Sequence, residues 1–75
     1  MRPVDLAAVS RIRAELGNGS ARAARLAAMI GTSEIAEAAG VSRQAVSAWE
    51  SGRAVPSAPH ALAYARALAA VASAA

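Results

Sequence analysis

The sequence contains no cysteine, no lysine and only one histidine among its 75 residues. Without cysteine the chain has neither a disulfide nor a thiolate zinc site, so helix packing or self-association must stabilise it. One histidine, His60, and five carboxylates assemble no acid-base or metal-ligand set in this sequence. We therefore expect no catalytic residue, no metal site, no cofactor and no enzymatic activity.

Long hydrophobic runs are also missing. No apolar run approaches the roughly 18 residues of a membrane span, and Met1 and Arg2 lead into Pro3 and Asp5 instead of a signal-peptide stretch. We expect neither secretion nor membrane insertion, and the absence of cysteine fits a cytoplasmic location.

Alanine dominates what is present. It supplies about a third of the chain and much of the 56% hydrophobic content, so helices form easily but each residue buries little area. A chain of this length predicts a single domain over residues 1–75 with a thin core. The net charge of +3 suits a polyanionic partner. The exclusive use of arginine is also what codon bias in a GC-rich genome produces, so we give the missing lysine no functional weight.

Apolar residues recur at helical spacing between glycine and proline breaks, which predicts an all-α, compact five-helix bundle. We expect a first helix over about 4–16, ended by Gly17, and a second helix that Ser20 caps, running to about Met29 before Gly31. A third helix is expected to follow Thr32 as its cap and to end before Gly40. A fourth would follow Ser42 and end before Gly52, and a fifth would follow Ser57 and end at about residue 72.

Residues 32–51 read as two short helices joined by a tight turn, which is a helix-turn-helix. Ala36 is small where the two helices must approach, Gly40 permits the turn, and Val41 and Val46 can seal the angle between them. A helix-turn-helix offers its second helix to the DNA major groove. The closing helix, about 58–72, supplies further apolar residues to the same core.

From Arg25 to Leu68 the sequence resembles the lambda-repressor-like, Cro or xenobiotic-response-element family of bacterial and phage regulators. The Trp-Glu-x-Gly ending of the motif, followed by a proline and an apolar helix, makes the resemblance specific. The matching residues are Thr32, Ile35, Ala36, Gly40, Val41, Ser42, Val46, Trp49, Glu50, Gly52, Pro56, Ala61, Tyr64, Ala65 and Leu68.

The resemblance implies that the helix beginning near Arg43 enters the major groove of double-stranded DNA. Its outward residues would be Ser42, Arg43, Gln44 and Ser47, with Ala48 too short for a hydrogen bond. Gln44 can pair with adenine or donate to guanine, and Arg43 can bind guanine or a phosphate. Thr32 and Arg53 would contact phosphates.

Trp49 and Glu50, the most distinctive residues of the motif, are predicted to stabilise the fold and not to contact DNA. Trp49 falls on the inward face, and the resemblance implies that Glu50 pairs with Arg25 in the family's opening helix. The resemblance also places Arg22 near the side of the fold that faces the DNA backbone. We interpret Arg22 as a solvated charge.

The helix over 4–16 is an addition to the family, and it either packs where a further carboxyl-terminal helix often lies or forms a dimer contact. We expect a small Cro-type or repressor-type transcription regulator of a phage or prophage, acting in the cytoplasm of a bacterium or host cell. The first alternative is an antitoxin that binds a toxin partner and its own promoter. The others are an excisionase-like recombination factor and a helical interaction module without a DNA role. A homodimer on a two-fold operator is compatible with the family.

Overall fold

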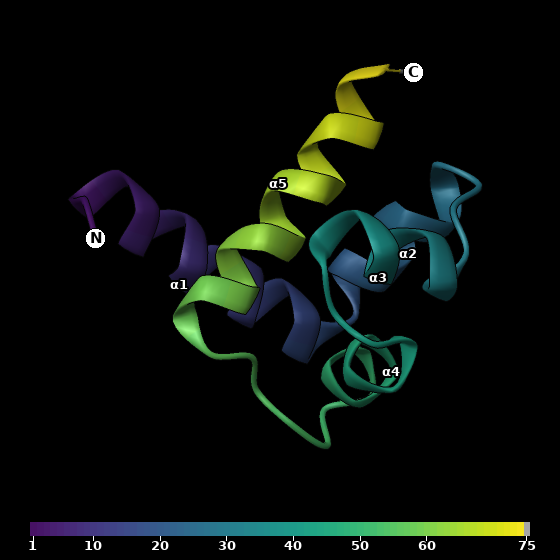
Figure 1. Ribbon diagram of the computed structural model, residues 1–75, viewed down its shortest axis with the longest axis horizontal. Helices are drawn as coiled ribbons and strands as arrows, with labels where there is room; N and C mark the ends of the chain where they lie inside the picture. The colour runs from purple at the N-terminus through teal and green to yellow at the C-terminus, as the bar shows by residue number, and fades with distance from the viewer. Residues whose placement is uncertain (75) are drawn as a thin grey trace.

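The computed structural model describes residues 1–74, which form five α-helices and no strand (Figure 1). The all-α expectation of a five-helix bundle with an added first helix is confirmed. Among the helices of this part, none has the length and apolarity needed to cross a membrane. In chain order they are α1 (Pro3–Asn18), α2 (Ser20–Ala27), α3 (Thr32–Ala39), α4 (Arg43–Glu50) and α5 (Ala58–Ala74).

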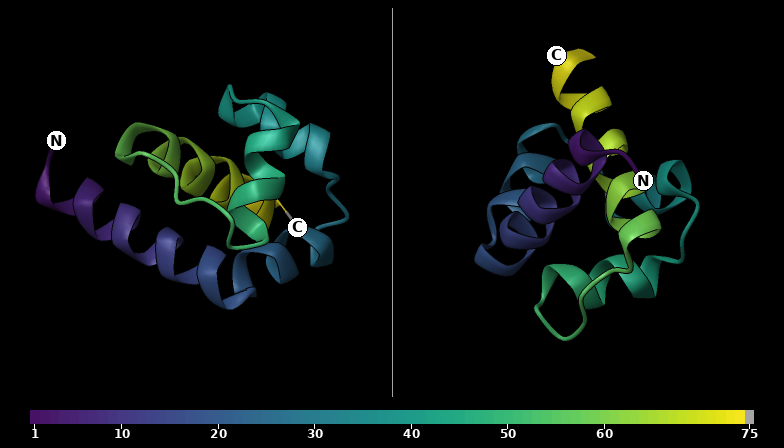
Figure 2. Two further views of the ribbon diagram at one scale, coloured as in Figure 1. Left: turned by 90° about the horizontal axis from the view of Figure 1, so that it is seen from below. Right: turned by 90° about the vertical axis from the view of Figure 1, so that its left-hand side faces the viewer.

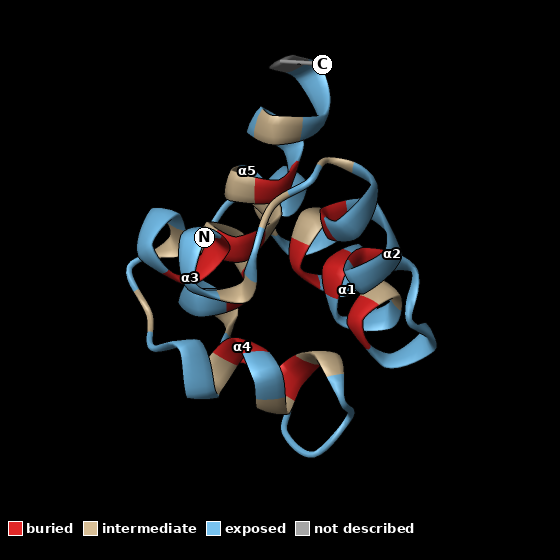
Figure 3. Cartoon of the chain, turned by 90° about the vertical axis from the view of Figure 1, so that its right-hand side faces the viewer, coloured by how far each residue is buried: buried red, intermediate tan, exposed pale blue. Residues whose placement is uncertain are grey.

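The closing helix α5 is the centre of the packing. It lies between α1 on one side and α3 on the other, and α1 runs alongside it (Figures 1 and 2). Helix α4 lies at one end of the bundle, with its buried residues toward the other helices and its exposed residues on the opposite side (Figure 3). The core consists of Val9, Ile12, Leu16, Ala21, Ile35, Ala36, Val46, Trp49, Ala61, Tyr64 and Leu68.

The first two helices differ from the sequence prediction at their junction. Helix α1 continues through Gly17 to Asn18, and the left-handed residue is Gly19 at φ 88°. Ser20 does not cap α2 as predicted but is its first residue, and the side chain of Asn18 accepts the Ser20 amide at 2.9 Å. The left-handed geometry that ends a helix is therefore provided two residues later than Gly17.

Helix α2 ends at Ala27, two residues before the predicted end at Met29. Met29 is left-handed, with φ 61°, although it is not a glycine. Its amide bonds to the Leu26 carbonyl, and the Ile30 amide bonds to the Arg25 carbonyl. This pair of bonds satisfies the end of the helix and lets half-buried Ile30 pack on the core, which offsets the cost of the left-handed methionine.

The capping of α3 also differs from the prediction. Gly31 is the capping residue and Thr32 the first residue of the helix, so Thr32 does not act as the cap. The carboxylate of Glu34 accepts a hydrogen bond from the Gly31 amide at 2.8 Å, the return bond of a capping box.

The later boundaries follow the prediction more closely. Gly40 ends α3 in the left-handed conformation, with φ 72°, and the Ser42 hydroxyl caps α4 by accepting the Ala45 amide at 3.0 Å. Both predictions are confirmed. Helix α4 ends at Glu50, one residue before the predicted boundary, and α5 extends to Ala74, two residues beyond it.

Candidate nucleic-acid interface

Helices α3 and α4 are joined by a turn that the backbone holds tightly. The Gly40 amide bonds to the Glu37 carbonyl at 3.1 Å, and the Val41 amide bonds to the Ala36 carbonyl at 3.0 Å. Ala36 is 2% exposed and Val46 0%, so the two helices meet through small or fully buried side chains. This packing turns the other face of α4 outward.

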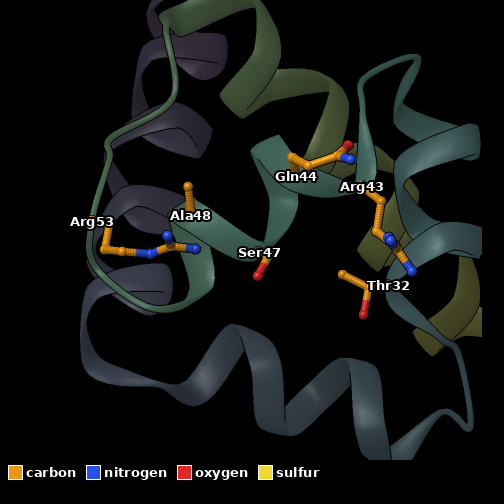
Figure 4. Close-up of a pocket in the computed structure, with 6 residues that line it drawn as sticks. All are labelled: Thr32, Arg43, Gln44, Ser47, Ala48 and Arg53. Carbon is orange, nitrogen blue, oxygen red and sulfur yellow. The ribbon is translucent and has the colours of Figure 1, made fainter.

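The outward face of α4 borders a surface concavity of about 420 Å³ (Figure 4). Five of the six residues predicted from the sequence to contact DNA line it, and Ala48 completes the lining. Arg43 and Arg53 reach it from opposite ends, with Ser47 between them and Thr32 beside Arg43 (Figure 4). The lining residues are Thr32, Arg43, Gln44, Ser47, Ala48 and Arg53.

The charge of the concavity has one sign. Arg43 and Arg53 are exposed, and among the lining residues in the described part of the chain none is acidic. Gln44 and Ser47 are also exposed and can donate or accept hydrogen bonds. The surface therefore combines two guanidinium groups, which attract anions, with neutral groups that can distinguish donors from acceptors.

Ser42 is the predicted contact residue that lies outside this concavity. Its hydroxyl oxygen accepts the Ala45 amide and so holds the first turn of α4. The hydroxyl proton stays free to donate, but the observed bond is a helix cap.

Arg53 is fixed by the end of α4. Gly52 is left-handed, with φ 79°, and its amide bonds to the Trp49 carbonyl at 3.2 Å. The Arg53 amide bonds to the Ala48 carbonyl, and the Arg53 Nε donates to the Ser51 hydroxyl, both at 2.9 Å. These bonds connect Arg53 to the end of α4 through its backbone amide and its Nε.

Behind α4 lies a buried polar network of Arg25, Glu50 and Tyr64, from α2, α4 and α5. The Nε and Nη2 of Arg25 donate to the two oxygens of Glu50 at 2.9 and 2.8 Å. The Tyr64 hydroxyl donates to Glu50 Oε2 at 2.8 Å, and Arg25 Nη1 donates to the Ile30 carbonyl at 2.8 Å. The structure thus brings together the predicted pair, and Tyr64 is a third member that the sequence analysis did not identify.

The network favours the charged forms of both ion-pair partners. Burial opposes ionisation of Glu50, but hydrogen bonds from Arg25 and Tyr64 outweigh it, and the pKa of the carboxyl is lowered. The hydrogen bond to Glu50 raises the pKa of Arg25. Burial, assisted by the hydrogen bond to Glu50, raises the pKa of Tyr64, which therefore remains a donor at neutral pH.

The lowered pKa of Glu50 predicts a loss of stability in acid. A carboxyl whose pKa is lower in the folded chain stabilises the fold above its unfolded value, near 4.5, and this contribution disappears as the pH falls through the folded value. We expect the free energy of unfolding to fall more between pH 6 and pH 3 in the wild type than in Glu50→Gln. Urea unfolding at both pH values measures this. Glu37→Gln, which changes an exposed carboxylate, should follow the wild type.

Trp49 belongs to the core, as the sequence analysis expected. It is 6% exposed and meets Tyr64 edge-on, with ring centroids 6.2 Å apart. His60 is exposed, as expected, but its ring lies 6.1 Å from that of Trp49. Arg22 lines a smaller concavity of about 260 Å³ beside the first, together with Thr32 and Ser47.

These features, a helix-turn-helix with a cationic and polar outer face, define a DNA-binding protein of the helix-turn-helix class. The chain belongs to the helix-turn-helix family of lambda-repressor-like and Cro-like transcription regulators, because the family model matches residues 22–71. The resemblance inferred from the sequence is thereby confirmed. No curated protein and no solved structure gave a significant match. All of α1 precedes the matched region.

Proposed function

We propose that the chain is a sequence-specific regulator that reads the DNA major groove with α4. The observation that carries this proposal is the single concavity that gathers Arg43, Gln44 and Ser47 on the outer face of that helix. The Gln44 amide matches the N6 and N7 edge of adenine, and the guanidinium of Arg43 matches guanine O6 and N7 or a phosphate. Each such bidentate pair contributes about 1–3 kcal/mol of discrimination.

Phosphate contacts would set the register of α4 in the groove. Thr32 begins α3, where amides not bonded within the helix face outward, and its side chain lies in the same concavity as α4. Arg53 lies at the other end. Two anchoring points on either side of Gln44 would match two phosphates flanking the bases that it reads.

Repression is the regulatory outcome we propose, in the manner of small Cro-type or repressor-type proteins. Occupying an operator that overlaps a promoter requires only the DNA-binding surface, whereas activation requires a second surface for the polymerase. We further propose that two copies bind a two-fold operator, with half-sites about one helical turn apart.

Selection of binding sites from random duplexes tests this proposal. We expect a consensus that contains adenine or guanine at the position of Gln44, and an affinity that falls steeply with salt. Enrichment of an inverted repeat would support the homodimer. Equal binding to all sequences would contradict sequence reading, and tight co-purification with a small basic protein would favour the antitoxin alternative.

A further inference from the structure

Helix α1 contacts the segment that follows the proposed recognition helix. The Nε and Nη2 of Arg13 both donate to the backbone carbonyl of Pro56, at 3.1 and 3.0 Å, across 43 positions of sequence. Pro56 is buried, and the bonds are partly buried. Arg13 lies outside the matched residues 22–71, so this contact adds to the family's fold.

The segment held by Arg13 lies between α4 and α5. Near α4, the amides of Arg53 and Ala54 both bond to the Ala48 carbonyl. Val55 is 74% exposed, and Pro56 is the residue where Arg13 attaches the segment to α1. Arg53, at one end of the concavity, is therefore separated by only two residues from a point fixed by α1.

The same contact also meets the inner face of α4. A small cavity of about 110 Å³ is lined by Arg13 and Leu16 of α1, by Trp49 of α4 and by Pro56. A shift of Pro56 would alter the surroundings of Trp49 as well as the path of the chain from Arg53. Arg13 thus connects α1 to the Pro56 end of the segment and lines the same cavity as Trp49.

We infer that Arg13 is a positioning residue for DNA binding, which holds the Arg53–Pro56 segment so that Arg53 can contact a phosphate. This inference rests on the proposed function. Arg13 acts through the backbone of Pro56 and not by touching DNA. It gives α1 a role beyond closing the core.

Four variants test the inference by their affinity for the selected duplex. We expect Arg13→Ala to weaken binding about three- to tenfold, because only part of the free energy of the two bonds to Pro56 is transmitted to the contact of Arg53 with DNA. Arg13→Gln should retain most of the affinity, because its Nε2 is as many bonds from the backbone as the Arg13 Nε. Arg11→Ala is the matched control. Arg11 carries the same charge on the same helix but lines a separate groove between α1, α2 and α5.

The fourth variant separates positioning from a direct phosphate contact. In an Arg53→Ala background, Arg13→Ala should cause no further loss of affinity, because the side chain it positions is already absent. An independent loss in that background, with Arg13→Gln as weak as Arg13→Ala, would mean that Arg13 itself binds phosphate. That result would overturn the inference.

A measurement without DNA keeps this test separate from the proposed function. Trp49 is the only tryptophan, so its fluorescence and the amide resonances of Arg53, Ala54, Val55 and Ser57 report on the segment directly. We expect both to change in Arg13→Ala and to stay near wild type in Arg11→Ala and Arg13→Gln. If both stay unchanged in Arg13→Ala, the inference fails even if the wild type binds DNA. If they change but the wild type binds no DNA, the proposed function fails and the inference fails with it.

Discussion

Replacing Arg25 by methionine is expected to lower the free energy of unfolding by about 3–5 kcal/mol, because Glu50 would remain buried without its cationic partner. The side chains of Arg25 and Glu50 are 6% and 5% exposed. The change also removes the bond from Arg25 to the Ile30 carbonyl, which holds the end of α2. A domain of this size has only about 4–11 kcal/mol of stability in total, so the loss removes a quarter of it or more.

Urea unfolding followed by Trp49 fluorescence measures this loss. Arg22→Met is the matched control, because it removes an exposed arginine from the same helix. The double variant Arg25→Met with Glu50→Gln should be more stable than Arg25→Met alone, since it leaves no buried charge. Equal stability of Arg25→Met and Arg22→Met, or an unchanged melting temperature in Glu50→Gln, would show that the pair is not structural.

The network matters for function because of which helices it joins. The network joins α2, α4 and α5 through Arg25, Glu50 and Tyr64, respectively. Its hydrogen bonds therefore fix the C-terminal end of α4 on its inner side. Arg13 fixes the segment that follows, and the Ser42 cap fixes the first turn. Polar contacts therefore hold α4 at both of its ends, and buried Val46 and Trp49 hold its middle against the core. Its outer face is left exposed.

The helix-turn-helix was predictable because its signals are local. Gly40, Ser42 and the small Ala36 each act within a few residues of their own position, and the structure uses each as predicted. The ends of α1 and α2 were not predictable from Gly17 and Gly31, because the buried Leu16 and half-buried Ile30 decide where the chain must turn.

Contacts between distant segments of the chain were the other part of the structure that could not be predicted from the sequence. A family resemblance suggested that Arg25 would meet Glu50, but nothing in the sequence indicates that Tyr64 donates to the same carboxylate. The bonds from Arg13 to Pro56 have even less local signal, because a backbone carbonyl can accept from any donor and the partner is chosen by how α1 packs.

Replacing Gln44 by alanine is expected to weaken binding to the selected operator about 10- to 100-fold while leaving binding to unrelated duplexes almost unchanged. Gln44 is exposed and lies on the outer face of α4, so its loss should not disturb the fold. Its neutral amide would exchange hydrogen bonds with a base edge, and such contacts distinguish one sequence from another without releasing counterions from the phosphates.

Arg53→Ala should behave in the opposite way and provides the contrast. It removes a guanidinium from the end of the concavity, so it should weaken binding to all sequences about equally and reduce the slope of log affinity against log salt by about one. Titrations of both variants on the operator and on a scrambled duplex, over a range of salt, separate the two effects. If Gln44→Ala lost affinity equally for both duplexes, Gln44 would contact the DNA backbone instead of a base. Arg43 would then be the residue that reads a base.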